Sequence, residues 1–298
     1  MTENHNIIPA RHIHEECGVF GIFTPQEADV ASYAYYALYS LQHRGQESAG
    51  IVVNDDGLFR SLRDTGLVSE VFPPEQLKSL GKGTIAVGHV RYGTTGSDNK
   101  RNVQPILVNH FKGRMALAHN GNLTNSRELR QELESRGSIF QTTTDSEVIA
   151  YIIVQERLNR GSIEEAVSAA MDRIEGAYSL VLSSPTKLIA ARDPHGFRPL
   201  CMGHLKDGSV VFASESCALD AIGAEFERDI RPGEIVVVDT AGVRSDTRAR
   251  AASPTASALS KISTSAARSS RPRRRCAKTR STSSSTPSAP WSRASASC

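Results

Sequence analysis

The order of the apolar segments predicts an α+β protein in which sheets and helices form separate layers. Segments with the short, β-branched pattern of strands come first, two or three helical segments occupy the middle, and strand-like segments return at the end. A doubly wound sheet would need strands and helices to alternate regularly, and they do not alternate here. No fixed-period repeat is visible, which argues against a solenoid.

The first third of the chain predicts several strands and one helix. CGVFGIF at 17–23 is an apolar run typical of a buried strand, and the apolar spacing in 28–41 indicates a helix. GIVVNDD at 50–56 ends in a turn signal before LFRSLRD, which indicates a hairpin. Three more strands are expected in GTIAVGHVRYG, QPILVN and RMALAHNGNL.

Three helices follow, each with a start signal. Thr124 or Asn125 can cap the first, which Gly137 would end. Asp145 opens the second, DSEVIAYIIVQERLN, and Ser162 begins the third as part of a capping box with a glutamate three residues on. The returning strands are YSLVLSS, KLIAARD, PLCMG, SVVFASES and EIVVVD.

The charge divides the 298-residue chain into two unlike parts. Residues 249–298 hold ten basic residues and no acidic one, so residues 1–248 carry a net charge of −7 although the whole chain carries +3. The end of the chain is rich in Ser and Ala, with too few large apolar groups to offset the entropy of ordering. We therefore expect a domain at 17–246, preceded by residues 1–16 and followed by a disordered basic tail at 247–298.

Composition excludes several classes of protein. No apolar run reaches the roughly 20 residues of a membrane helix, so no membrane association is expected. Residues 1–16 lack the marks of a secretory signal or a mitochondrial leader, which predicts a cytoplasmic location. The five cysteines include no C-x-x-C pair and the nine histidines no H-E-x-x-H motif, so no disulfide framework or local metal site is expected.

Four local features carry candidate chemistry, and each by itself has an ordinary structural explanation. Cys17, ahead of an apolar strand, is typical of a small core residue. RYGTTG at 91–96 is typical of a surface turn after a strand. HNGNL at 119–123 contains Asn-Gly, the strongest hairpin-turn dipeptide, and TTTDSE at 142–147 is typical of a helix cap.

In this order, five segments resemble class II glutamine amidotransferases, the N-terminal-nucleophile type: CGVFGI, LQHRGQESAG, GHVRYGTTG, AHNGNLTN and TTTDSEVIA. LQHRGQESAG and ARDPHGFRPL are similar to the amidophosphoribosyltransferase branch of that group. The sugar-amidating branch, which is the alternative, usually has Tyr-Asp where Gln46 and Glu47 stand here. The resemblance runs from Cys17 to about Asp246.

The resemblance implies a four-layer αββα sandwich of two antiparallel sheets, the fold of the N-terminal-nucleophile (Ntn) hydrolases. It also implies that the domain hydrolyses glutamine to glutamate and ammonia. Full-length members add this ammonia to phosphoribosyl pyrophosphate, giving 5-phosphoribosylamine in the first step of purine biosynthesis. Histidines inside the motifs are expected to make structural hydrogen bonds rather than to catalyse: His43, His89, His119 and His195.

Site roles follow residue by residue from the same resemblance. Cys17 would be the nucleophile. The side-chain amide of Asn120 and the backbone N–H of Gly121 would form the oxyanion hole. Glutamine would be bound by four further residues: Arg91 at its α-carboxylate, Asp145 at its α-ammonium, Gly45 beside the nucleophile, and Tyr92 on a loop that closes over it.

The implied nucleophile also needs a base. In this family the base is the α-amino group of the cysteine itself, whose ordinary pKa of about 7.7–8.0 suits cellular pH far better than that of lysine. Residues 1–16 would then be a propeptide, released when the bond between Glu16 and Cys17 is cleaved.

Family members continue beyond Asp246 into a phosphoribosyltransferase domain, and no such domain is recognisable here. Three explanations of the tail are open: a nucleic-acid-binding segment around RPRRR at 271–275, a flexible linker, or out-of-frame translation of a GC-rich gene. The last is favoured because it tends to yield Ser, Ala, Arg and Pro. No specific nucleic-acid partner is therefore expected.

Cofactors and partners are expected mainly in the full-length relatives. Those use Mg²⁺, and some with a cleaved leader hold a 4Fe-4S cluster through four cysteines. Cys276 in the tail is no credible ligand, so no cofactor or metal is expected in this chain. The expected partners are glutamine and, only with the missing domain, phosphoribosyl pyrophosphate, in a homo-oligomer at full length. The non-enzyme alternative is a catalytically silent fragment that binds nucleic acid nonspecifically through its tail.

Overall fold

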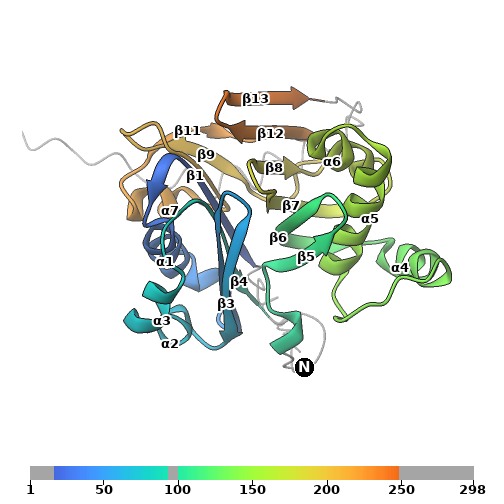
Figure 1. Cartoon of the computed structure of the whole chain (residues 1–298), viewed down its shortest axis with the longest axis horizontal. Helices are drawn as coiled ribbons and strands as arrows, with labels where there is room; N and C mark the ends of the chain where they lie inside the picture. Colours follow the sequence, from blue (N-terminus) through green and yellow to red (C-terminus); the bar gives the residue numbers. More distant parts are fainter. Residues whose placement is uncertain (1–16, 93–99, 248–298) are drawn as a thin grey trace, which may run out of the picture.

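Two antiparallel sheets lie face to face between helices in the computed structural model, which describes residues 17–92 and 100–247 (Figure 1). Sheet A has seven strands in the order β11 (Glu225–Asp229), β9 (Cys201–His204), β10 (Val210–Ala213), β1 (Gly18–Ala28), β4 (Gly83–Arg91), β2 (Ser48–Asp55) and β3 (Leu58–Thr65). Sheet B has six in the order β13 (Gly242–Thr247), β12 (Glu234–Asp239), β8 (Leu188–Arg192), β7 (Gly176–Ser183), β6 (Gly113–Leu123) and β5 (Ile106–His110). The predicted αββα sandwich is confirmed.

The helices form the two outer layers. Sheet A is covered by α1 (Val30–Ser40), α2 (Val68–Val71), α3 (Pro74–Ser79) and α7 (Ser216–Ala221). Sheet B is covered by α4 (Ser126–Ser135), α5 (Asp145–Asn159) and α6 (Ile163–Met171), and two 3₁₀ turns lie at Gln42–Arg44 and Lys100–Asn102. Across the described ranges, no helix has the length and apolar character needed to cross a membrane.

Alternation of apolar side chains explains why the layers stack in this way. In β1, Phe20 and Ile22 pack into the cluster beneath α1, whereas Val19 and Phe23 point to the cluster between the sheets. In β8, Ile189 likewise packs towards α5 and α6, while its neighbours face sheet A. Each central strand is therefore buried on both faces, and the sandwich has three apolar layers.

Several elements lie where the sequence predicts them. Helix α5 begins at Asp145 and ends at Asn159, the predicted bounds. Helix α1 begins after Asp29, whose carboxylate accepts a hydrogen bond from the backbone N–H of Ser32. The hairpin of β2 and β3 turns at Asp56 and Gly57, both with positive φ, as a two-residue turn requires.

Other elements differ from the prediction. The strand predicted for RMALAHNGNL is confirmed as β6, where Asn120 and Gly121 pair with β7, so the alternative interpretation of HNGNL as a hairpin turn is wrong. The Ser162 side chain does cap α6 by accepting from the Glu165 N–H at 3.2 Å, but the Glu165 carboxylate accepts from Gly161 rather than from Ser162. Five elements had no predicted counterpart: α2, α3, α7, β11 and β13.

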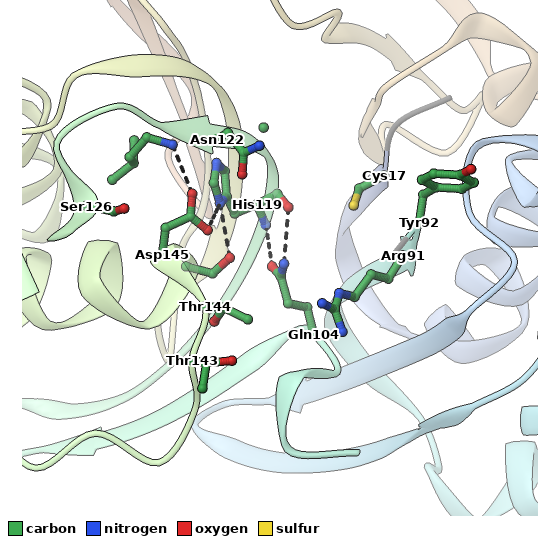
Figure 2. A pocket seen from close by; sticks show the side chains of 13 residues that line it. Cys17, Arg91, Tyr92, Gln104, His119, Asn122, Ser126, Thr143, Thr144 and Asp145 are labelled. Atoms are coloured by element: carbon green, nitrogen blue, oxygen red, sulfur yellow. Dashed lines mark hydrogen bonds and ion pairs between the residues drawn. The ribbon is translucent and has the colours of Figure 1, made fainter. Parts of the chain in front are cut away.

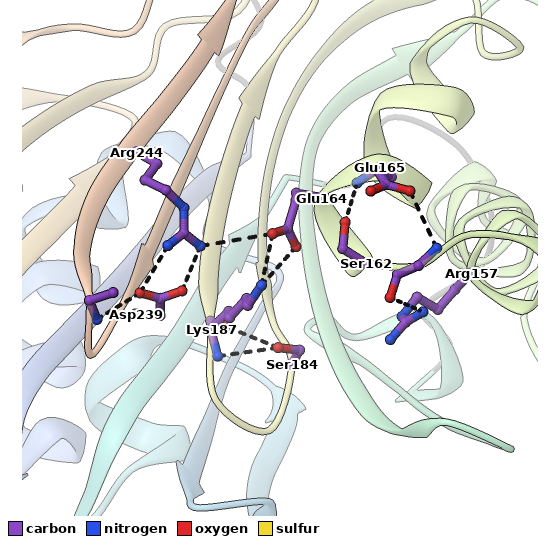
Figure 3. A network of polar contacts seen from close by, with 10 residues as sticks. Arg157, Ser162, Glu164, Glu165, Ser184, Lys187, Asp239 and Arg244 are labelled. Atoms are coloured by element: carbon purple, nitrogen blue, oxygen red, sulfur yellow. Dashed lines mark hydrogen bonds and ion pairs between the residues drawn. The ribbon is translucent and has the colours of Figure 1, made fainter.

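Strand β13 shows why a polar segment can still be a strand. All its residues are exposed, so it lacks the apolar alternation that would predict it. Arg244 in β13 lies 2.6 Å from Asp239 in β12 and 3.8 Å from Glu164 in α6, and Glu164 also binds Lys187 at 2.8 Å (Figure 3). This network and the pairing with β12 hold the edge strand, which ends at Thr247, one residue beyond the predicted boundary.

Candidate active site

One pocket joins the end of sheet A to the end of sheet B. Its lining includes Cys17, Arg91, Gly121 and Asp145, which lie up to 128 positions apart in the chain. In Figure 2, Cys17, Arg91 and Tyr92 lie on one side and Asp145 on the other, with Gln104 and His119 between them. Tertiary structure thus brings most of the predicted site residues together.

Cys17 lies directly before β1 and is partly buried. Its carbonyl oxygen accepts a hydrogen bond from Nε of Arg44 at 3.2 Å. Burial raises the pKa of its thiol, and a hydrogen bond from the backbone of Tyr92 and the positive charges of Arg91 and Arg44 oppose that rise only in part. The thiol is therefore protonated near neutral pH, and its use as a nucleophile requires a base.

Arg91 ends β4 and lies almost completely buried in an ion pair. Its Nη1 donates to Oε1 of Glu47 at 3.0 Å, and the Glu47 backbone N–H donates to the Arg91 carbonyl at 3.0 Å. A Cβ at Gly45 would lie 2.6 Å from the Arg91 carbonyl carbon, so a side chain does not fit there. The obstacle is the backbone of Arg91, and Gly45 is not among the residues that line the pocket.

Asn120 and Gly121 occupy the end of β6. The Asn120 side chain is fully buried, and neither Nδ2 nor Oδ1 has a hydrogen-bond partner within the described structure. Gly121 has a φ of 143°, and a Cβ there would lie 2.0 Å from the carbonyl oxygen of Ala177 in β7. His119 and Gly121 line the pocket, with Asn120 between them in the strand.

Asp145 is the first residue of α5, where the helix dipole favours a negative charge. Its Oδ2 accepts from the backbone N–H of Leu123 at 2.9 Å, and its Oδ1 lies 3.6 Å from Nδ1 of His119. Tyr92 lines the pocket and lies beside Cys17 (Figure 2). Residues 93–99, which follow Tyr92, lie outside the described residues, so the closing of the Tyr92 loop over glutamine stays a prediction.

Three of the four motif histidines make hydrogen bonds through their rings. His43 bonds to Glu215 at 3.1 Å, His89 to the His119 carbonyl at 3.1 Å, and His119 to Oγ of Ser146 at 3.0 Å. Burial lowers the pKa of His89 to about 3 and also lowers that of His119, so both rings are neutral. The ring of His195 instead packs against Phe197.

Sequence reasoning missed several residues of the pocket wall. Gln104 faces the pocket from the segment before β5, and Thr143 faces it from the loop before α5. No local pattern marks Gln104, because its role depends on the strand opposite. The other missed lining residues are Asn122, Leu123, Ser126, Thr144 and Ser146.

No metal or cluster site forms among the residues that the structure describes. Within 17–92 and 100–247, no three His, Cys, Asp or Glu side chains converge as ligands would. Three cysteines are described there, and all are free thiols. Cys276, the tail and the proposed propeptide lie outside the described residues, so the expectations about them stay predictions.

Relatives of known type match this chain. Residues 89–221 match a family model described as a glutamine amidotransferase domain. Amidophosphoribosyltransferase of Bacillus subtilis is 44% identical over 235 residues, covering 78% of this chain and 48% of the relative. That of Synechococcus elongatus is 48% identical over 243 residues, covering 80% and 49%. The chain therefore spans about half the length of these curated relatives.

Two solved structures are similar in fold to this chain. The glutamine phosphoribosylpyrophosphate amidotransferase of B. subtilis, solved with ADP and GMP, superposes with a TM-score of 0.71 at 43% identity, covering 78% of this chain and 49% of that one. A glutamine aminotransferase class-II domain protein of Silicibacter pomeroyi superposes with a TM-score of 0.51 at 14% identity, covering 77% of this chain and 98% of that one. The second match shows a shared fold alone.

Proposed function

Since the chain carries a glutamine amidotransferase domain similar to that of amidophosphoribosyltransferases, we propose that it hydrolyses glutamine to glutamate and ammonia. The observation that carries this proposal is the pocket itself. It places a thiol, a guanidinium and a carboxylate around the end of a strand that holds a buried amide with no hydrogen-bond partner in the part of the chain that the structure describes. These are the groups that binding and cleaving a free amino-acid amide require.

Charge complementarity sets the orientation of glutamine. Its α-carboxylate would lie against Arg91, and its α-ammonium would lie against Asp145 at the start of α5. Glu47 holds Arg91 in place through the buried ion pair. The side-chain amide of glutamine would then lie between Cys17 and the end of β6.

Cleavage follows from the groups at that point. Sγ of Cys17 attacks the amide carbon as its proton passes to the base, and the carbonyl oxygen becomes an oxyanion. Nδ2 of Asn120 and the backbone N–H of Gly121 donate to that oxyanion. The C–N bond breaks as the leaving nitrogen takes the proton and departs as ammonia. Water then hydrolyses the thioester, which releases glutamate and restores the thiol.

The base would be the α-amino group of Cys17. Because burial raises the pKa of the thiol, a free amine next to it is needed to accept the proton. In the printed sequence this nitrogen is in a peptide bond with Glu16, so the proposal includes cleavage of that bond. The released segment would be residues 1–16.

The ammonia acceptor belongs to the longer relatives. In a polypeptide that also contains their second half, the ammonia would aminate phosphoribosyl pyrophosphate to 5-phosphoribosylamine, in a homo-oligomeric cytoplasmic enzyme. The similar proteins of B. subtilis and S. elongatus are amidophosphoribosyltransferases, which supports this reaction over the sugar-amidating alternative.

The test uses the whole purified chain. Glutamate and ammonia are measured after incubation with glutamine, and mass spectrometry reads the N-terminus of the active material. We expect equal amounts of both products and Cys17 as residue one. An active protein that still carries residues 1–16 would rule out the α-amine as base. A mature protein with Cys17 at its N-terminus that releases no glutamate would support the silent-fragment alternative.

A further inference from the structure

We propose that Gln104 is a positioning residue for glutamine hydrolysis, because its side-chain amide holds the end of β6 that carries the oxyanion donors. The inference rests on the proposed function. Oε1 of Gln104 accepts from the backbone N–H of His119 at 2.7 Å, and Nε2 donates to the His119 carbonyl at 3.3 Å. Asn120 and Gly121 follow directly in the chain.

The register of the sheet explains why a side chain is needed there. Strand β5 pairs with β6 from His110–Gly113 to Ile106–Leu117, and continuing this register would place residue 104 opposite His119. The strand begins only at Ile106, however, so among residues 17–92 and 100–247 no strand pairs with the β5 side of β6 at His119. The amide of Gln104 supplies the donor and acceptor that a strand backbone would have supplied.

The main chain of Gln104 is held by sheet A instead. Its carbonyl oxygen packs so closely on β2 that a Cβ at Gly50 would lie 2.1 Å from it. Nη1 of Arg63 in β3 donates to the carbonyls of Val103 at 3.2 Å and Pro105 at 2.9 Å. The backbone is thus fixed on one sheet while the side chain binds the other.

A second contact from sheet A reaches the same point. Nε2 of His89 in β4 donates to the His119 carbonyl at 3.1 Å. The His119 backbone is therefore held at both its N–H and its C=O by groups anchored outside sheet B. We call these hydrogen bonds from Gln104 and His89 to the His119 backbone the clamp. Misplacing reacting groups by about 1 Å can cost on the order of 100-fold in rate, so losing the clamp should lower the rate of glutamine hydrolysis.

The chemistry of the amide gives the sharpest variant. A primary amide both donates and accepts, whereas an ionised carboxylate of the same shape only accepts. Gln104→Glu keeps the acceptor for the His119 N–H and sets a negative oxygen against the His119 carbonyl. Gln104→Leu removes both bonds.

The matched control is Asn54→Asp. Asn54 is another buried amide that joins the sheets, with Nδ2 donating to Ser183 Oγ, Ser184 O and Pro185 O at 2.8–3.0 Å. Asn54 is not among the residues that line the pocket. The substitution Asn54→Asp therefore makes the same change from amide to acid at a buried position outside the site.

The experiment measures kcat, KM, melting temperature and backbone hydrogen exchange over residues 117–122 in the full chain. We expect Gln104→Glu to lower kcat roughly 10- to 100-fold with KM changed less than about threefold, and to speed exchange in that segment. Gln104→Leu should do the same, and Asn54→Asp should lower the melting temperature with kcat unchanged.

Each other outcome overturns the proposal. Unchanged exchange in both Gln104 variants would show that the amide does not hold β6. Faster exchange with normal kcat would make Gln104 purely structural, and a raised KM with normal kcat would make it a substrate contact. If the wild-type chain releases no glutamate, the proposed function fails, while the exchange measurement still tests the clamp.

Discussion

Two buried asparagines in this sandwich have opposite surroundings. Asn54 and Asn120 are both fully buried. Asn54 makes four hydrogen bonds, three from Nδ2 and one accepted by Oδ1 from the Gly57 N–H at 2.8 Å. The side chain of Asn120 makes none within the described structure. Asn54 lies in β2 and Asn120 in β6, and both are next to β7, since Asn54 contacts Ser183 and Asn120 pairs with Ser179 there.

This difference indicates that the Asn54 amide has a structural role and that the Asn120 amide has a role in the reaction. A buried polar group without a partner costs about 1–3 kcal/mol, so a fold retains one only where something else requires it. At Asn54 the amide stabilises the joint between the sheets. At Asn120 its donors face no competing acceptor, which suits an oxyanion that exists only during the reaction.

The largest effect on activity should come from replacing Cys17, the proposed nucleophile. Cys17→Ala should lower glutamine hydrolysis by roughly 1000-fold or more, because no thioester can form. The control is Cys201→Ala, which alters a buried thiol bonded to the Ala213 carbonyl and away from the pocket. It should lower stability and leave turnover nearly normal. A Cys17→Ala protein with full activity would contradict the proposed function.

The asparagine pair gives the next largest effect and tests the comparison directly. Asn120→Ala should lower kcat about 100- to 1000-fold. Its unfolding free energy should stay equal or rise, because an unpartnered buried amide is removed. Asn54→Ala should do the reverse, with normal kcat and a loss of about 2 kcal/mol or more in the unfolding free energy. Urea unfolding and steady-state kinetics measure both, and similar behaviour of the two variants would invalidate the comparison.

Arg91→Lys should have a smaller effect, mainly on binding. The lysine keeps the charge but loses the planar fork that matches a carboxylate, so KM for glutamine should rise roughly 10- to 100-fold with a lesser change in kcat. Initial rates over a range of glutamine concentrations measure this. Arg244→Lys, on the exposed edge strand β13, is the control. A fall in kcat at unchanged KM would place Arg91 in the chemical step instead.

The smallest expected effect is the pH dependence of stability contributed by His89. Its pKa is held near 3 mainly by burial and further lowered by the positive charge of nearby Arg91, so the folded protein keeps it neutral while the unfolded chain protonates near pH 6.5. Stability is therefore full above pH 6.5 and falls with acidification, by about 2 kcal/mol at pH 5. His89→Gln should flatten that slope in urea unfolding at pH 5 and 7. Equal slopes for His89→Gln and wild type would refute the assignment.

The sequence alone predicts those turns and helices that are stabilised by interactions between residues close together in the chain. The hairpin at Asp56–Gly57 follows from the turn dipeptide, and α5 follows from its acidic first turn and apolar run. The candidate residues Cys17, Arg91 and Asp145 also came from the sequence, through motifs that lie far apart in the chain. Only the tertiary structure places these three around one pocket.

The remaining features depend on residues distant in sequence. The Asn120-Gly121 dipeptide by itself favours a turn, whereas the whole segment RMALAHNGNL predicts the strand that forms; cross-strand hydrogen bonds to β7 and burial outweigh the dipeptide preference. Strand β13 exists through its partners rather than through apolar alternation. The sequence by itself therefore determined the apolar periodicity of helices and strands, the turn at Asp56–Gly57 and the candidate motif residues. Tertiary packing decided which buried amide is satisfied, because hydrogen-bond partners come from strands that no short window of sequence contains.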